Sequence, residues 1–281
     1  MEAPLKLRRQ QQENMLAPHK PLLILLAIGA WQQHLELDWV YVKKHLGGLL
    51  RRFTNSTKEK AFEPFMRLTR DEGGKLWIVD GADLFRANGN VNVTNLSKQN
   101  PKARFHEDFV AKFLKDKGAL KALVQWLLQD FPDSLHQDIL VQAGVEVELT
   151  VAPLTPVSKK FRADVMNAYD HQCAVCGFGG RIDTETAIGV EAAHIQMKSR
   201  LGPDKVTNGL ALCSLHHKLF DSGAFYIDHN FAVKVSDKFG GSGKDQALIR
   251  FHDEQISLPR NDAKRPDLIY LNWQKRELFK A

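Results

Sequence analysis

An apolar run, LLILLAIGA at residues 22–30, follows directly after Pro21. Proline is tolerated in the first turn of a helix, where its missing N–H would have no partner. A segment that is apolar on every side is typical of a helix inside a core. The run is shorter than the roughly 20 residues that span a bilayer, and His19 and Lys20 crowd its entrance. We therefore expect a core helix, not a signal peptide, and no membrane association.

The rest of the first half alternates between helical and extended patterns. Residues 37–53 carry apolar positions at helical intervals around a Gly-Gly pair, where we expect a break. Residues 61–81 predict two short extended segments joined by a second Gly-Gly turn. Residues 100–140 predict one or two long helices that break near Gly118 and Pro132. This half is predicted to be mainly helical.

Residues 141–158, VQAGVEVELTVAPLTPVS, contain prolines and show no periodicity, which is typical of a linker. They separate a domain at residues 1–140 from a second domain at residues 159–281. The second domain opens with a helix, KKFRADV, that runs into a cysteine motif, and it closes with a helix in PDLIYLNWQKRELFK. The expected fold class is α+β.

Composition adds the class of protein and of partner. The 281 residues suit two domains, and 43% hydrophobic with 26% charged residues is ordinary for a globular protein. A formal charge of +6 modestly favours a polyanionic partner. The three cysteines are an odd number confined to the second half, which favours metal ligation in a reducing compartment over disulfides. We expect a cytoplasmic protein.

Two short pairs of potential metal ligands stand in the second half. Cys173 and Cys176 form a CxxC pair, and Cys213 and His216 form a CxxH pair. Two intervening residues let both members of a pair face one ion, and two pairs complete the tetrahedral set of a structural zinc site. Zn²⁺ bound there would stabilise a small domain, without chemistry of its own.

His217 directly follows His216 and needs a separate explanation. Consecutive residues of a helix point about 100° apart, so the two rings cannot comfortably serve one ion. One turn later, Asp221 shares the face of His217. This pair either holds a second, divalent cation or is a hydrogen-bonded pair that ties the helix down.

Upstream, the strand-like residues 190–195 contain His194, a Gly-Pro-Asp loop follows, and Asn208 lies in a turn before the helix of His217. This order, bracketed by the two zinc pairs, resembles the HNH endonuclease family over residues 173–225. The resemblance implies a ββα-metal fold, in which two antiparallel strands and a helix surround a catalytic metal.

The resemblance also implies roles for three residues. His194 takes the place of the general base that removes a proton from water, which a neutral imidazole can do. Asn208 takes the place of the asparagine that braces the loop and orients the base. His217 takes the place of the ligand of a catalytic Mg²⁺ or Mn²⁺. The products would carry a 5′ phosphate and a 3′ hydroxyl.

One departure concerns the catalytic ligands. Many members of the family have a metal-binding aspartate or histidine directly before the base, where this chain has Ala193. We expect Asp221 or Glu191 to compensate, or the ion to be held loosely.

Two segments of the first domain, APHKPLLILLAIG and EPFMRLTRDEGGKLWIV, resemble the sulfur-recognition domain that precedes HNH modules in restriction enzymes attacking phosphorothioated DNA. Sulfur keeps the charge of a phosphate but makes one face larger and poorly hydrated, so a reader needs cations beside an apolar pocket. The resemblance implies that His19 and Lys20 contact the phosphate at a helix N-terminus. Pro64, with Phe62 or Phe65, would supply the apolar wall.

Further positive residues extend this expected surface. Arg51, Arg52 and Arg67, together with Arg70, are candidates for phosphate contacts, which add affinity and salt dependence without sequence information. Glu63 stands where members of the family often have an aromatic residue, and a carboxylate there would repel a phosphate.

The expected protein is a modification-dependent restriction endonuclease that binds phosphorothioated double-stranded DNA and hydrolyses phosphodiester bonds. With one active site per chain, cutting both strands requires a homodimer or two successive nicks. Two alternatives remain. One is an HNH nuclease directed to methylated DNA, which needs a pocket for a flipped base. The other is a DNA-binding regulator whose HNH fold has lost catalysis.

Overall fold

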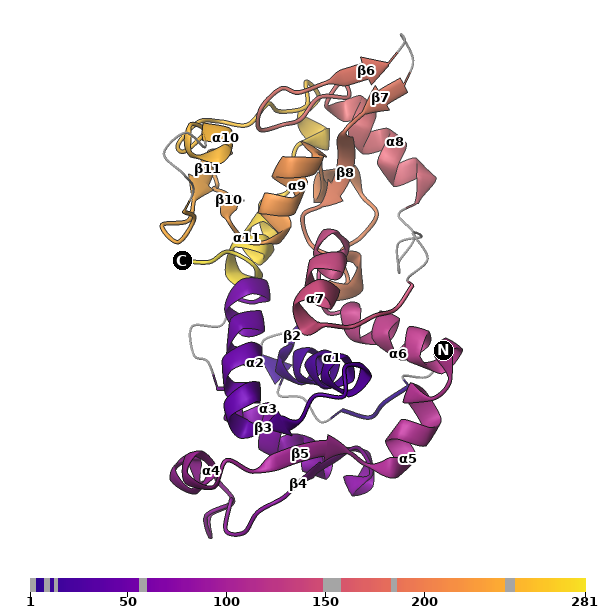
Figure 1. The fold of residues 1–281 in the computed structure, drawn as a ribbon. Coiled ribbons are helices and arrows are strands. Elements are labelled where there is room, and N and C mark those ends of the chain that lie inside the picture. The colour runs from indigo at the N-terminus through magenta and orange to yellow at the C-terminus, as the bar shows by residue number, and fades with distance from the viewer. Residues whose placement is uncertain are drawn as a thin grey trace. The chain divides into compact units, whose positions relative to one another are not determined.

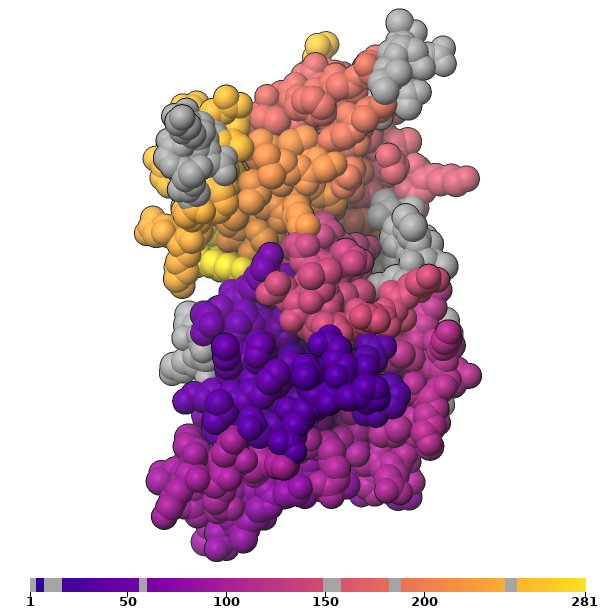
Figure 2. All heavy atoms as spheres, in the orientation of Figure 1, coloured from indigo at the N-terminus to yellow at the C-terminus, as the bar shows by residue number. Residues whose placement is uncertain are grey.

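The computed structural model describes residues 4–7, 11–12, 15–55, 60–148, 158–182, 186–240 and 246–281. The chain divides into two compact units, Met1–Val151 and Ala152–Ala281 (Figure 1). On the face seen in Figure 2, the described atoms of each unit form a densely packed surface. Among the described residues, no helix combines the length and the apolar character that crossing a membrane requires.

Unit 1 is mainly helical, as predicted. Its α-helices are α1 His19–Gln32, α2 Trp39–Phe53, α3 Phe62–Arg67, α4 Val93–Gln99, α5 Glu107–Phe109, α6 Lys117–Leu128 and α7 His136–Ala143. Shorter turns are the 3₁₀ segments η1 Leu68–Gly74 and η3 Asp133–Leu135 and the π-helical η2 Val110–Leu114. The strands β3 Leu37–Asp38, β5 Lys102–Phe105 and β4 Trp77–Val79 form an antiparallel sheet in that order, and β1 Gln11–Gln12 pairs with β2 Met15–Leu16.

Helix α1 forms the centre of unit 1 and confirms the predicted core helix. Eleven consecutive residues from Lys20 to Ala30 are buried. Helices α2, α3, α6 and α7 pack around it. A Cβ on Gly29 would lie 2.0 Å from the carbonyl oxygen of Ala143, so only glycine allows the backbones of α1 and α7 to approach this closely.

The predicted break in α2 is wrong. The helix runs from Trp39 to Phe53 through both glycines, and the side chain of Asp38 caps its start by accepting the backbone N–H of Tyr41. Its buried positions, which include Leu46 and Leu50, recur at helical spacing on both sides of the glycines. Burial of this continuous apolar face outweighs the roughly 1 kcal/mol that each glycine costs a helix.

Two segments were assigned the wrong type of secondary structure from the sequence: one forms a helix instead of a strand, and the other a strand instead of a helix. Residues 62–67 form α3 instead of an extended segment, because Pro64 lies in the first turn, where proline is tolerated, and Phe65 and Met66 face the core. Residues 102–105, predicted as helix, form β5, because they pair with β3 and β4 on either side. Pairing partners far away in the chain decide this strand, and periodicity within the segment does not reveal them.

The end of unit 1 extends beyond the predicted domain boundary. Helix α7 continues to Ala143, and Gly144, in the left-handed conformation, ends it. The Gln32 side chain then bonds the backbone of Glu146 through both its amide nitrogen and its oxygen. Of the predicted linker, residues 149–157 lie outside the described part of the chain.

Unit 2 contains the antiparallel hairpin and helix that the HNH resemblance implies. Strand β8 Val190–His194 pairs with β9 Gly209–Cys213, and α9 Ser214–Asp221 follows directly. The other elements are α8 Lys159–Ala168, β6 Gly180–Ile182, β7 Thr186–Ile188, β10 Phe225–Ile227, β11 Val233–Val235, α10 Gln246–Ile249, α11 Leu268–Glu277 and the 3₁₀ turns η4 Lys198–Arg200, η5 Val206–Asn208 and η6 Asp262–Lys264. The expected α+β class is confirmed.

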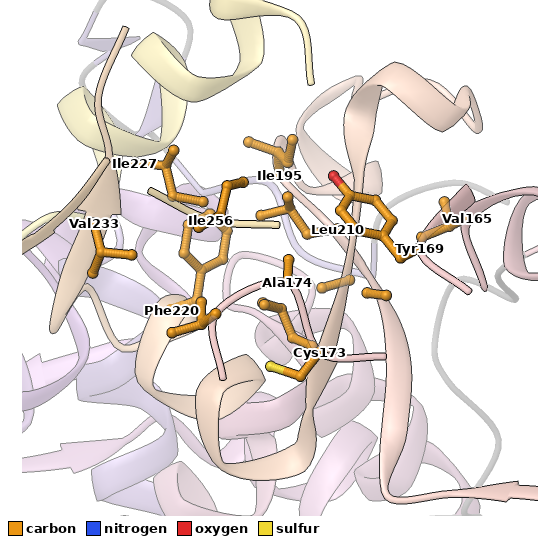
Figure 3. Close-up of a cluster of buried hydrophobic side chains, with 14 of the residues drawn as sticks. Val165, Tyr169, Cys173, Ala174, Ile195, Leu210, Phe220, Ile227, Val233 and Ile256 are labelled. Carbon is orange, nitrogen blue, oxygen red and sulfur yellow. The ribbon is translucent and has the colours of Figure 1, made fainter. Parts of the chain in front are cut away.

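The hairpin is held between helices by a single apolar cluster (Figure 3). Val165 of α8, Leu210 of β9 and Phe220 of α9 are fully buried in it. A Cβ on Gly209 would lie 2.3 Å from the Cγ2 atom of Val165, so glycine is needed where α8 rests on the hairpin. The close packing of α8 against the hairpin places Phe161 beside His194.

Candidate functional site

The four residues of the two predicted zinc pairs converge. One ligand atom from each of Cys173, Cys176, Cys213 and His216 lies within 4.8 Å of all the others. The His216 Nδ1 atom is 3.1 Å from the Cys213 sulfur and 3.7 Å from the Cys173 sulfur, and the Cys176 and Cys213 sulfurs are 3.9 Å apart. Tetrahedral Zn²⁺ with bonds of about 2.3 Å needs ligand separations of roughly 3.8 Å, so the donor set fits a zinc ion.

The surroundings of His216 prepare its ring for metal binding. Its Nε2 atom lies 2.9 Å from the carbonyl oxygen of Ala247, which accepts a hydrogen bond. That bond keeps the proton on Nε2 and leaves the lone pair of Nδ1 directed at the sulfurs. Burial raises the pKa of the Cys173 thiol, and a bound cation would act in the opposite direction.

His217 has entirely different partners. Its Nδ1 atom is 2.7 Å from Glu191 of β8, and its Nε2 atom is 3.3 Å from Asp221. The hydrogen bond from His217 is the largest cause that lowers the pKa of Glu191, and Ser214 donates to the other oxygen of the same carboxylate. The rings of His216 and His217 therefore contact different groups.

The two carboxylates meet opposite nitrogens of the His217 ring. His217 and Asp221 lie in contact on one helix face, with His217 Nε2 3.3 Å from an Asp221 carboxylate oxygen. Asp221 is only 7% exposed, whereas the Glu191 side chain is about half exposed. The Nδ1 side of the His217 ring, beside Glu191, is therefore more accessible than the side that faces Asp221.

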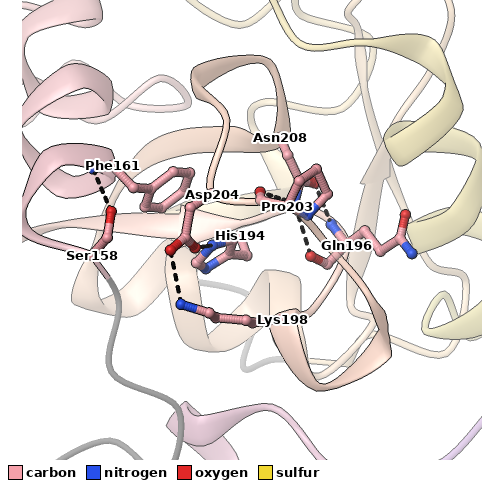
Figure 4. A network of polar contacts seen from close by, with 8 residues as sticks. All are labelled: Ser158, Phe161, His194, Gln196, Lys198, Pro203, Asp204 and Asn208. Carbon is pink, nitrogen blue, oxygen red and sulfur yellow. Dashed lines mark hydrogen bonds and ion pairs between the residues drawn. The ribbon is translucent and has the colours of Figure 1, made fainter.

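His194 ends β8 and is held on two sides (Figure 4). Its ring stacks on Phe161 of α8, with centroids 4.0 Å apart and planes 5° from parallel. Its Nε2 atom is 2.9 Å from Asp204, and Lys198 binds the second oxygen of that carboxylate at 2.8 Å. Burial raises the pKa of Asp204, but the hydrogen bonds and charges of Lys198 and His194 outweigh it, so the net shift is downward.

Sequence reasoning did not single out Asp204 or Phe161. Asp204 lies in the predicted Gly-Pro-Asp loop, where aspartate is also a common turn former and so gives no distinct signal. Phe161 belongs to the apolar face of a helix.

Asn208 is fully buried and braces the loop between β8 and β9 (Figure 4). Its side-chain oxygen accepts the backbone N–H of Gln196 at 2.8 Å. Its amide group donates to the carbonyl oxygens of Gln196 at 3.0 Å and of Pro203 at 3.1 Å. Asn208 thus closes both ends of the loop that carries Asp204.

In unit 1, the two residues expected at the phosphate lie in different environments. His19 is the first residue of α1 and is partly exposed, and burial lowers the pKa of its imidazole. Lys20 is only 8% exposed, and its ammonium is 2.5 Å from the fully buried carboxylate of Asp71. This buried ion pair joins α1 to a turn 51 residues away.

The expected apolar wall lies in the core of unit 1. Phe65 is fully buried between Trp39 and Trp77, with ring centroids 5.3 Å and 6.2 Å away, and Trp77 donates to its carbonyl oxygen. Pro64 is also buried, whereas Phe62 is partly exposed. Of the two phenylalanines weighed from the sequence, Phe62 is the one that reaches the surface.

The arginines are more accessible. Arg51 and Arg52 are exposed in the last turn of α2, with the Arg52 guanidinium 5.6 Å from the centre of the Phe53 ring. Arg67 forms an ion pair with Glu63 one turn earlier in α3. This pair places a positive group directly beside the carboxylate that departs from the family pattern.

Two families match the chain. Residues 2–148 match the ScoMcrA-like DNA sulfur-binding domain family, and residues 173–228 match the HNH endonuclease family. No curated protein matches.

Solved structures similar to the chain include the modification-dependent TagI restriction endonuclease, at 26% identity, with 48% of this chain and 41% of that chain covered and a TM-score of 0.32. They also include the sulfur-binding domain of ScoMcrA complexed with phosphorothioated DNA, at 20% identity, 50% and 94% coverage and a TM-score of 0.40. A structure of the sulfur-binding and SRA domains of ScoMcrA with phosphorothioated DNA has 18% identity, 66% and 56% coverage and a TM-score of 0.43. The chain thus spans less than half the length of the TagI enzyme.

Proposed function

Because the chain belongs to the ScoMcrA-like family of DNA sulfur-binding domains and carries an HNH endonuclease domain, we propose that it is a phosphorothioation-dependent DNA endonuclease. Unit 1 binds double-stranded DNA in which sulfur replaces a phosphate oxygen, and unit 2 hydrolyses phosphodiester bonds. The observation that carries this proposal is the union of the two families on one chain.

The reading surface combines a helix N-terminus with an apolar edge. His19 opens α1, where the first backbone N–H groups have no partners within the helix and favour an anion. Beneath this surface, Lys20 pairs with the buried carboxylate of Asp71 and so fixes the start of α1. Pro64 and Phe65 support the apolar edge from the core, and Arg67 offsets the charge of Glu63. Arg51 and Arg52 add phosphate contacts that are independent of sulfur.

In unit 2, His194 acts as the general base. The Asp204 carboxylate accepts the Nε2 proton of His194 and leaves Nδ1 as the basic atom of the ring. The flat contact with Phe161 fixes the plane of the ring, and Asn208 fixes the loop that carries Asp204. Asp204 and Asn208 are therefore positioning residues for His194.

His217 and Glu191 would hold the catalytic ion, with Glu191 taking the place of the ligand that is missing at Ala193. Mg²⁺ or Mn²⁺ there would stabilise charge on the leaving 3′ oxygen. With a cation bound, Nδ1 of His217 would exchange its hydrogen bond to Glu191 for the metal, and Asp221, 3.3 Å from Nε2, would favour the proton on that nitrogen. Zn²⁺ bound by the three cysteines and His216 would stabilise the fold of the unit.

Matched duplexes test the proposal. Plain, cytosine-methylated and phosphorothioated versions of one sequence are digested with Mg²⁺ or Mn²⁺ by the parent, by His194→Ala and by His229→Ala, an exposed histidine outside the site. We expect cleavage of the phosphorothioated duplex alone, by the parent and His229→Ala. Preference for the methylated duplex would support the methylation-directed alternative. Equal background cleavage by the parent and His194→Ala would support the regulator.

A further inference from the structure

Leu201 is the most exposed large hydrophobic residue in the described part of the chain. Its side chain and backbone together are 91% exposed, whereas the next, Ile269, is 65% exposed. It stands in the loop between β8 and β9, and its backbone has φ 64° and ψ 17°. This left-handed conformation favours glycine and is uncommon for a bulky residue. The position therefore combines an apolar side chain in solvent with a strained backbone.

The loop that carries Leu201 is well bonded. The N–H of Leu201 donates to the carbonyl oxygen of Lys198, and that of Gly202 donates to Met197. The Gln196 side chain binds the carbonyl oxygen of Arg200 at 2.7 Å. The same residue, Gln196, is bonded by Asn208 through its backbone. The hydrogen bonds of this turn thus hold the backbone of Leu201 in place while its side chain is exposed to solvent.

The surroundings of Leu201 fit a polyanion. Lys198, Arg200 and Lys205 lie within four residues of it along the chain, and the acidic Asp204 between them is bound by Lys198. Asp204 also binds His194, and it follows Leu201 by three positions in the chain. Three Cα–Cα steps span at most about 11 Å, so the backbone of Leu201 lies near the residue that binds the general base. Positive charge around the leucine favours a nucleic acid over an apolar protein surface.

We propose that Leu201 is a wedge that enters the minor groove and inserts between stacked bases near the bond to be cut. Leucine is one of the residues that architectural DNA-binding proteins use in this way, and a fixed turn suits insertion because little freedom is lost on binding. The proposal rests on the proposed nuclease function and adds an interaction with bases that neither a sulfur reader nor a metal site supplies. It implies that cleavage favours flexible pyrimidine–purine steps, which unstack easily.

The test separates strain from function. Leu201→Gly relieves the left-handed backbone and removes the wedge, Leu201→Met keeps an apolar wedge, and Ile269→Ala is a matched control at another exposed apolar position. We expect Leu201→Gly to unfold at the same or a higher temperature than the parent. We expect it to cleave phosphorothioated duplex at least about tenfold more slowly, while Leu201→Met and Ile269→Ala stay near the parent.

A second measurement requires binding alone. In a His194→Ala background, phosphorothioated duplexes carrying 2-aminopurine near the cut should brighten when Leu201 is present and stay dark with Leu201→Gly, because unstacking raises the fluorescence. A two-base mismatch at that step should restore cleavage by Leu201→Gly. An unchanged signal or unchanged cleavage with Leu201→Gly overturns the wedge and leaves the nuclease standing. A parent that brightens the probe but cleaves no duplex overturns the proposed function and supports the wedge.

Discussion

Replacement of Asn208 by alanine tests the link between the loop and the catalytic base. The substitution removes three hydrogen bonds from a fully buried position, one accepted from Gln196 and two donated to Gln196 and Pro203. At about 1 kcal/mol for each bond, the loop loses about 3 kcal/mol of stability. With tenfold for every 1.4 kcal/mol, backbone hydrogens of the loop should exchange about 100-fold faster.

Hydrogen exchange read by mass spectrometry over residues 195–204 measures this loss, and cleavage of phosphorothioated duplex is followed in parallel. We expect a large loss of cleavage, because Asp204 no longer holds His194, while binding to DNA through unit 1 persists. Asn208→Asp should be equally damaging, since its second oxygen would face two carbonyl oxygens. Asn230→Ala, at an exposed turn, is the control. Parent-like exchange in Asn208→Ala would refute the brace, and parent-like cleavage would refute its coupling to the base.

Three further predictions concern the zinc site, the buried ion pair and the contact between Gly209 and α8. His216→Ala should lose the tightly bound metal in native mass spectrometry and lower the unfolding temperature, whereas His217→Ala should keep that metal and lose cleavage. Asp71→Asn should destabilise unit 1 by about 3–5 kcal/mol in urea unfolding because it strands the Lys20 ammonium, and adding Lys20→Met should recover part of the loss. Gly209→Ala should lower both the unfolding temperature and the cleavage rate, since its Cβ would collide with α8.

The parts of the site that sequence predicts are those whose spacing is local. Two CxxC-type pairs and adjacent histidines on one helix impose their geometry within a few residues, so the separation of His216 from His217 follows from the helix alone. For the missing ligand, the sequence leaves Asp221, Glu191 or a loosely held ion. The contact between Glu191 and His217 could not be predicted, because the register of β8 against β9 determines where Glu191 lies relative to α9.

The parts that escaped prediction depend on residues brought together by the fold. The sequence offers Lys20 as a phosphate contact, but its ion pair with Asp71, in a turn 51 residues later, is set by the fold. The local pattern of residues 102–105 predicts a helix. They form strand β5 because they pair with β3 and β4, which come from separate parts of the chain. In each case tertiary packing overrides the local preference.

Helix α1, at the centre of unit 1, has no solvent-exposed face between Lys20 and Ala30. Most helices bury one stripe and expose the opposite face, but eleven successive residues of α1 are buried. A saturation library across residues 20–30 would therefore be depleted as one unbroken block, without the usual periodic gaps. Divergence of this segment over evolutionary time therefore requires paired changes in the helices that enclose it.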